Sequence, residues 1–205
     1  MLDEIERRLT WRAQPGVALL ERMLKIAGAL LALKELEYFG AVQEGELIGR
    51  VQRLTDGLLK PLEKEWLKGR AESDVVARVK LIRMAVLPEL ISGTLTKAEQ
   101  ERRWRELEDT YLAQQLSCYP AGYLTSHPTP ERIIETAERF EEDLTDHVRV
   151  LAPFRAVIDV GEAIPVSPER ARLESGDPLM NHLRERLETM LAASLAEYRP
   201  GATMP

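Results

Sequence analysis

The sequence predicts a mainly α-helical fold, an irregular bundle of five or six helices with a single C-terminal strand. Apolar residues recur at steps of three and four along most of the 205 residues, which is the spacing of one helix face. Ser, Thr, Gly and Pro stand where these segments begin and end. Only one segment is rich in β-branched residues instead. We expect a helical domain at residues 1–150, and at 151–205 the strand with a C-terminal helix that packs on it or on a missing partner.

The first two predicted helices lie in the N-terminal third of the chain. Residues 16–39 are apolar on nearly every face, as in helices at the centre of a core, and Gly40 follows where a left-handed C-cap belongs. Residues 44–67 are amphipathic, with apolar side chains every three or four positions. Because Pro61 lies inside this second segment, we expect a kink or an interruption there.

Capping residues mark the next two helices. Residues 73–74, Ser-Asp, precede a third helical segment that ends near Gly93, and Pro88 predicts a bend late in it. Thr96 and Glu99 match a capping box, in which the first side chain accepts a hydrogen bond from the backbone of the second. The sequence therefore predicts that a fourth helix begins directly after Thr96.

Two similar tetrapeptides suggest further helix starts. Thr129-Pro130-Glu131-Arg132 combines a hydroxyl cap, a proline at the first helical position and an acid in the first turn. Ser-Pro-Glu-Arg at residues 167–170 begins a short helical turn. Shared helix-start chemistry explains both tetrapeptides, so they do not predict an internal repeat. Asp-Pro at residues 177–178 caps the last helix.

The predicted strand covers residues 155–166, which are β-branched, broken by Gly161 and stopped by Pro165. An isolated strand leaves its backbone donors and acceptors unpaired, and even a single hairpin is marginal in water. We therefore expect residues 155–160 to join a sheet that another chain or domain supplies. The other interpretation is that they pair with a segment that the pattern does not reveal as a strand.

Composition narrows the classes of partner and compartment. A formal net charge of −6 argues against general nucleic-acid binding, which needs a concentrated basic surface. A single cysteine cannot form an intramolecular disulfide and is typical of a reducing compartment. The N-terminus lacks the pattern of a signal peptide, and the most apolar segment, residues 26–33, is too short to span a bilayer. These features predict a cytoplasmic protein.

Candidate reactive residues cluster in the stretch at residues 114–124, which holds Cys118, with His127 just beyond it. No signature of a cysteine enzyme surrounds Cys118, and the histidines are too far apart in the sequence to form a ligand-spaced pair. The chain also lacks the glycine-rich nucleotide loops and the Gly-x-Ser-x-Gly motif of hydrolases. We therefore predict no catalytic residue, no metal site and no cofactor, and interpret the stretch as a structural joint.

A basic face of the second predicted helix is the one candidate contact surface. Lys60, Lys64 and Lys68 follow each other at steps of four, next to Trp66, a pattern compatible with anionic lipid headgroups. Acidic residues are interleaved with these lysines, and a solvated helix face is the alternative interpretation. The hypothesis is that this face contacts an anionic membrane surface from the cytoplasmic side.

Several segments together resemble the region that follows the catalytic core in bacterial phospholipid/glycerol acyltransferases, the 1-acylglycerol-3-phosphate acyltransferase family. They are residues 6–12 (Glu-Arg-Arg-Leu-Thr-Trp-Arg), 31–38, 111–116 leading to Tyr-Pro at 119–120, 128–132, 140–143 and 160–164. The last, Val-Gly-Glu-Ala-Ile, looks like the Gly-Glu-Pro-Ile strand near the end of such domains, with Ala163 where proline is usual. The resemblance touches most of the chain.

The catalytic signature of that family is missing. It consists of a histidine followed five residues later by an aspartate, and here the residues five after His127, His147 and His182 are Arg, Ala and Leu. The resemblance therefore implies a non-catalytic accessory or C-terminal domain, which docks on or regulates an enzyme of membrane phospholipid synthesis. The alternative is a stand-alone helical interaction module that self-associates through the strand edge or an apolar helix face.

Overall fold

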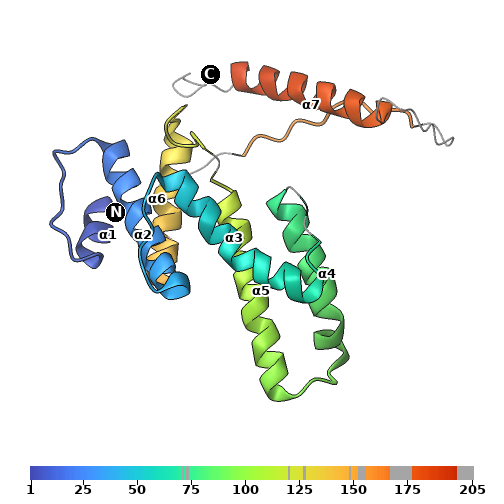
Figure 1. Cartoon of the computed structure of the whole chain (residues 1–205). Coiled ribbons are helices and arrows are strands. Elements are labelled where there is room, and N and C mark those ends of the chain that lie inside the picture. Colours follow the sequence, from blue (N-terminus) through green and yellow to red (C-terminus); the bar gives the residue numbers. More distant parts are fainter. Residues whose placement is uncertain are drawn as a thin grey trace. The chain divides into compact units, whose positions relative to one another are not determined.

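The computed structural model describes residues 1–70, 72, 74–119, 121–126, 128–147, 149–151, 156–166 and 177–197. The chain divides into two compact units, Met1–Leu151 and Ala152–Pro205. The helices are α1 Leu2–Arg8, α2 Leu19–Phe39, α3 Leu47–Trp66, α4 Val75–Ser92, α5 Lys97–Ser117, α6 Pro130–Thr145 and α7 Pro178–Glu197 (Figure 1). The expectation of a mainly helical chain is confirmed.

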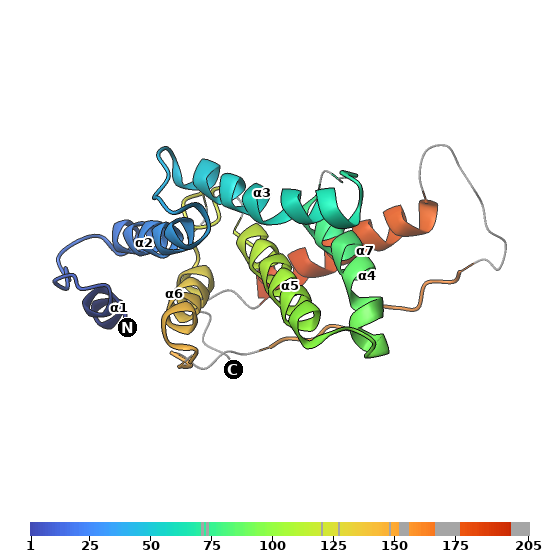
Figure 2. The same ribbon diagram turned by 60° about the horizontal axis from the view of Figure 1, so that its bottom comes forward.

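Two apolar cores hold the first unit together. One lies between α3, α4 and α5, and α2 contributes Leu31 to it. The other lies between α1, α2 and α6 and contains Met23, Ile26 and Phe140. Figure 2 shows α4 and α5 extending side by side from α3, with α1, α2 and α6 grouped apart from them. Since α2 contacts α3 as well as α1 and α6, it links the two cores.

Most of the predicted helix boundaries are confirmed. The side chains of Asp74, Thr96 and Thr129 each accept a hydrogen bond from the backbone N–H three residues later, and Gly40 and Gly93 end their helices in the left-handed conformation. The described residues contain one helix more than the prediction allowed, because α1 is only seven residues long and too short for a periodic signal.

The expected interruption at Pro61 does not occur. α3 runs from Leu47 to Trp66 with Pro61 inside it, and α4 likewise continues past Pro88 to Ser92. Leu58, Leu59 and Leu62, on both sides of Pro61, are buried in the same core. This burial offsets the backbone hydrogen bond that proline cannot donate.

The predicted C-terminal strand is wrong for the residues that the structure describes. Residues 156–166 are extended but belong to no strand, and residue 155 lies outside the described residues, as does the tetrapeptide at 167–170. Within the described part of the chain, no backbone–backbone hydrogen bond to residues 156–166 is formed. A strand exists only by pairing with another strand, so β-branched residues alone could not produce one here.

The three helices α2, α3 and α4 form a tandem repeat. They begin at Leu19, Leu47 and Val75, which are 28 residues apart. Each starts with two apolar residues, any residue, an arginine and an apolar residue. At the eighth position stand residues with no exposed surface, Ile26, Leu54 and Ile82. The repeat therefore lies in the helices, and the tetrapeptides at helix starts are unrelated to it.

The arginine of each repeat forms a buried ion pair with a glutamate of the preceding helix, which we call a clasp. Among the described residues, the clasps join Glu6 to Arg22, Glu35 to Arg50 and Glu63 to Arg78, with hydrogen bonds of 2.6 to 3.1 Å. The three glutamates are at most 3% exposed. Because both partners are bidentate, each clasp fixes how one helix meets the next.

The clasp glutamates also shape the loops between helices. Glu6 and Glu35 each accept a hydrogen bond at 3.0 Å from the backbone N–H of the residue eight positions later, and Glu141 in α6 accepts one at 3.1 Å in the same way. Between the glutamate and the residue that donates to it, Thr10 after Glu6 and Asp146 after Glu141 have positive φ angles of 63° and 55°. Such a conformation costs a non-glycine residue about 1–3 kcal/mol, which the hydrogen bonds to the glutamates offset.

Candidate functional site

The stretch around Cys118 is a joint between two helices. Cys118 is the C-cap of α5 and is exposed, while Leu124 reaches the core of α1, α2 and α6. The rings of Tyr119 and Tyr123 meet edge to face at 5.8 Å, and burial raises the pKa of Tyr119 to about 12. The tyrosines pack and hydrogen-bond, and His127 lies outside the described residues.

The structure separates Trp66 from the lysines that the sequence placed beside it. Lys60, Lys64 and Lys68 are exposed, and Lys60 pairs with Asp56 at 3.1 Å. Trp66 stands two residues after Lys64, about 200° around the helix axis. Its side chain is half-buried and faces α5.

Contacts with α5 hold Trp66 in place. The indole N–H donates to Glu106 at 3.0 Å, and the guanidinium of Arg103 lies 4.6 Å from the ring centre. Burial raises the pKa of Glu106, and the charge of Arg102 opposes that shift. Trp66 is therefore part of the α3–α5 packing. Lys60 and Lys64 lie on α3, whereas Lys68 follows the C-cap residue Leu67 with a φ of 55°, so the basic face consists of two lysines of α3 and one just beyond its end.

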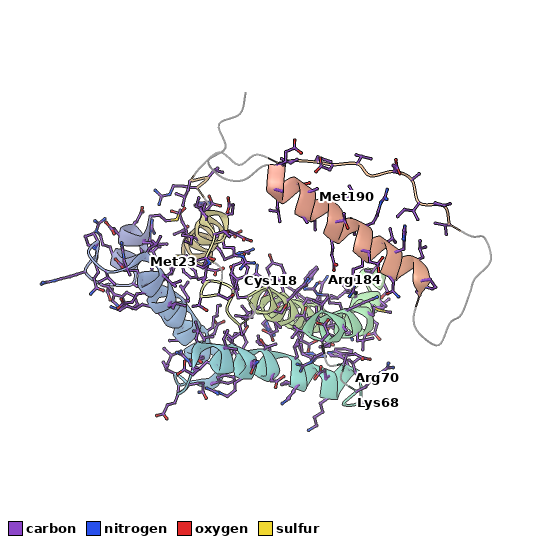
Figure 3. All side chains as sticks on the ribbon, turned by 90° about the horizontal axis from the view of Figure 1, so that it is seen from above. Met23, Lys68, Arg70, Cys118, Arg184 and Met190 are labelled. Carbon is purple, nitrogen blue, oxygen red and sulfur yellow. The ribbon has the colours of Figure 1, made fainter. Side chains whose placement is uncertain are left out.

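Within the second unit, residues 156–166 run antiparallel to α7. Asp159 accepts a hydrogen bond from Ser194, and Glu162 lies 3.5 Å from Arg186. Gly161 permits the close approach, because a side-chain carbon there would lie 2.8 Å from the sulfur of Met190. Figure 3 shows Met190 on α7 with the extended segment alongside. Asp159 and Gly161 share one side of the segment, whereas Glu162, which has the register of Ile158 and Val160, reaches Arg186 through a side chain that is 91% exposed.

The opposite side of the segment is apolar and open. Ile158 is 84% exposed and Val160 is 91% exposed, and both alternate with Asp159 and Gly161, which meet α7. Alternation of this kind is what an extended chain produces when one face packs and the other does not. Backbone donors and acceptors that have no backbone partner among the described residues, next to exposed β-branched side chains, make residues 156–160 a template for strand addition.

Helix α7 also presents an exposed apolar face. Met180, Leu187, Leu191 and Leu195 are 57–72% exposed and follow one another at steps of seven, four and four residues. The half-buried residues of the helix, including Leu183 and Met190, lie on the side that meets the extended segment. We take residues 156–160 with this face of α7 as the candidate interaction surface.

Comparison with known proteins found no matching family model, no matching curated protein and no matching solved structure. No group of His, Cys, Asp and Glu that could hold a metal ion occurs in the described part of the chain. Across the same residues, no helix combines the length and apolar character that crossing a membrane requires.

Sequence reasoning pointed to residues 155–166 as a segment that needs a partner, but it identified neither the exposed face of α7 nor the clasps. The β-branched composition of residues 155–166 was signal enough for an extended segment that seeks a partner. The clasps also have a signal, since Arg22, Arg50 and Arg78 stand 28 residues apart. That spacing becomes visible only when the chain is compared with itself at a fixed offset.

Proposed function

We propose that this chain is a non-catalytic accessory domain of membrane phospholipid synthesis, which docks on or regulates a catalytic domain of the phospholipid/glycerol acyltransferase class. Two kinds of support lead to the proposal. The segments described above resemble the region after the catalytic core of such enzymes. The observation that carries the docking step is the open edge of residues 156–160, where Ile158 and Val160 are exposed beside a backbone that has no backbone partner within the described part of the chain.

The docking step follows from the backbone chemistry of the segment. An extended peptide that adds to the edge of a sheet gains affinity from main-chain hydrogen bonds and specificity from alternate side chains. Five residues of strand span about 16 Å, so residues 156–160 suffice to pair along one edge strand. Ile158 and Val160 then fill apolar sites on the partner, while α7 covers the other side.

A second candidate function uses the same edge. An open strand edge can also pair with the same segment of a second copy, which would make the chain a stand-alone module that self-associates. The exposed apolar face of α7 also supports self-association, because two copies could bury these faces against each other. The two functions differ in partner, so one binding experiment separates them.

The experiment combines the full chain with the catalytic domain, containing His-x-x-x-x-Asp, of an acyltransferase encoded beside its gene. Calorimetry measures affinity for the wild type, Val160→Pro and the matched control Val160→Ala. Proline removes a strand donor whereas alanine retains it, so we expect proline to weaken binding at least about tenfold and alanine to weaken it less. Equal losses would show that the backbone does not pair. Dimerisation without binding to the catalytic domain would establish the second candidate.

The non-catalytic part of the proposal has its own test. The catalytic domain is assayed for acyl transfer to lysophosphatidate with and without the chain, and the chain is assayed alone. We expect activity only when the catalytic domain is present. Acyl transfer by the purified chain alone would overturn the assignment as an accessory domain.

Contact with an anionic membrane is the remaining component, and the basic face of α3 is its proposed site. Flotation with vesicles that contain anionic lipid should bring the chain to the lipid fraction, because each exposed lysine near such a surface contributes about 1 kcal/mol. Lys64→Glu with Lys68→Glu should abolish flotation. The control, Lys97→Glu, reverses an exposed lysine at the start of α5. Flotation that is unchanged by the double reversal would exclude this face.

A further inference from the structure

One face of α4 is apolar and open. Val76 is 52% exposed, Met84 62% and Ile91 80%, and half-buried Leu87 lies between them. Their spacing of three, four and eight residues places them along one side of the helix. We call these four residues the α4 stripe. An exposed apolar row of this length on a helix marks an interaction surface.

The tandem repeat shows that this face is covered in the other two copies. The residues equivalent to Leu87 are Leu31 and Leu59, which are 6% and 0% exposed. The position of Ile91 is held in the earlier copies by the clasp residues Glu35 and Glu63, which are buried. In α4 alone, an exposed apolar residue replaces the buried glutamate. The third copy therefore lacks the cover that the same positions have in α2 and α3.

A groove of about 250 Å³ runs beside the stripe, between α4 and α5, and two cations line it. Arg83 donates to the hydroxyl of Thr110 and to the side-chain oxygen of Gln114, both at 2.9 Å. Lys80, one turn earlier, is exposed. Among the described residues, no carboxylate lies within ion-pair distance of Lys80 or Arg83.

This arrangement differs from that of three other arginines of the unit, two of them buried and one half-buried. Arg50, Arg78 and Arg103 each pair with at least one carboxylate, whereas the described partners of Arg83 are neutral. Neutral partners fix the guanidinium but leave its charge uncompensated. A cation that is already held in position loses little side-chain freedom on binding an anion. Arg83 is thus prepared for a carboxylate from outside the chain.

We propose that the α4 stripe binds an amphipathic helix of a partner protein, whose carboxylates meet Lys80 and Arg83. Apolar anchors at helical spacing are the pattern of helix-in-groove recognition. The ends of the stripe, Val76 and Ile91, are fifteen positions apart, about 22 Å, which corresponds to roughly four turns of a partner helix. The partner helix should be acidic, because Lys80 and Arg83 both line the groove and neither has a carboxylate partner among the described residues.

This inference is independent of the proposed function. The stripe belongs to the unit Met1–Leu151, whereas the docking edge belongs to residues 156–160 of the other unit. Loss of one binding activity therefore leaves the other in place. Variants in α4 test the helix site, and variants at Val160 test the docking edge.

The test uses two synthetic peptides of about 15 residues that share one leucine face. One peptide carries glutamates beside that face and the other carries lysines. Fluorescence anisotropy measures their binding to the full chain. We expect the acidic peptide to bind at least about tenfold more tightly than the basic one, with a difference that shrinks as salt is added.

Three variants connect this binding to the stripe. Met84→Asp should abolish it, because a carboxylate would stand among the apolar anchors and beside the cations. Lys80→Ala should reduce the preference for the acidic peptide. Leu33→Asp is the matched control, since Leu33 is a comparably exposed leucine on α2, at 51%, and binding should not change. Circular dichroism verifies that each variant is folded.

Three results would overturn the proposal. The first is equal affinity for the acidic and basic peptides. The second is no binding of either peptide at concentrations up to about 1 mM, since that limit corresponds to about −4 kcal/mol. The third is a dimer of the chain, seen by sedimentation, that Met84→Asp dissociates, because a second copy would then be the occupant.

Discussion

The two units of this chain treat their polar groups in opposite ways. In Met1–Leu151, glutamates buried at helix ends satisfy both the next arginine and the backbone of the loop. In Ala152–Pro205, the backbone of residues 156–160 has no described partner, and Ile158 and Val160 are exposed. In the first unit, these buried polar groups bond to one another. In the second unit, the described backbone of residues 156–160 is available to a partner. This contrast is the main support for placing the docking edge in the second unit.

The α4 stripe is an exception within the first unit. The clasps close the first two copies of the repeat, and Ile91 replaces the clasp glutamate in the third. An acid instead reaches the next helix from Glu89, which pairs with Arg103 at 2.5 Å. Since Glu89 is 61% exposed, this pair is more open to solvent than a clasp. The third copy of the repeat therefore lacks the buried glutamate that the first two copies have.

The largest expected effect comes from breaking a clasp. Glu35→Ala should lower the free energy of unfolding by about 3–5 kcal/mol, because it leaves Arg50 largely buried without its carboxylate. Urea unfolding measures this loss. The control on the same helix is Glu37→Ala, whose exposed pair with Lys34 should contribute less than about 1 kcal/mol. Similar losses in both variants would mean that the clasp does not hold the first unit together.

A smaller effect is expected when both partners are replaced together. Glu35→Leu with Arg50→Met removes the buried charges as well as the clasp, and such replacements are often close to neutral. The amide of Gln43 then loses its acceptor, which should cost about 1–3 kcal/mol. Unfolding should therefore show that most of the single-variant loss is recovered. A double variant as unstable as Glu35→Ala would indicate a larger net contribution from the clasp.

Lowering the pH should remove part of the stability that each clasp contributes. Hydrogen bonds from Arg50 lower the pKa of Glu35, and burial opposes that shift. A carboxyl whose pKa is lower in the folded state stabilises the fold above its unfolded pKa, about 4.3, and loses that contribution as pH falls through the folded pKa. The stability difference between wild type and Glu35→Gln should thus be constant near neutral pH and shrink below about pH 4. A difference that grows towards acid would contradict the assigned direction.

The smallest effect on stability is expected in the second unit. Ile158→Asp should change the free energy of unfolding by less than about 0.5 kcal/mol, because the side chain is 84% exposed. Thermal unfolding monitored by circular dichroism checks this. The same variant should abolish binding to the catalytic domain. A strongly destabilised Ile158→Asp would show that this side chain belongs to a core of the chain itself.

Local sequence patterns were sufficient for the helices but not for their partners. Thr96 and Thr129 marked helix starts because the capping chemistry is contained in four consecutive residues. Residues 156–166 could not be assigned as a strand correctly, since a strand depends on a neighbour that the pattern does not contain. Trp66 was grouped with the lysines by adjacency in sequence, whereas its contact with Glu106 joins residues 40 apart.

Amide hydrogen exchange of residues 156–166 tests the central claim most directly. In the chain alone, these amides should exchange rapidly, because within the described residues they have no backbone partner. With the acyltransferase catalytic domain added, alternate amides of residues 156–160 should become protected, as in a strand that joins a sheet edge. Protection in the chain alone, or no change when the catalytic domain binds, would contradict the account.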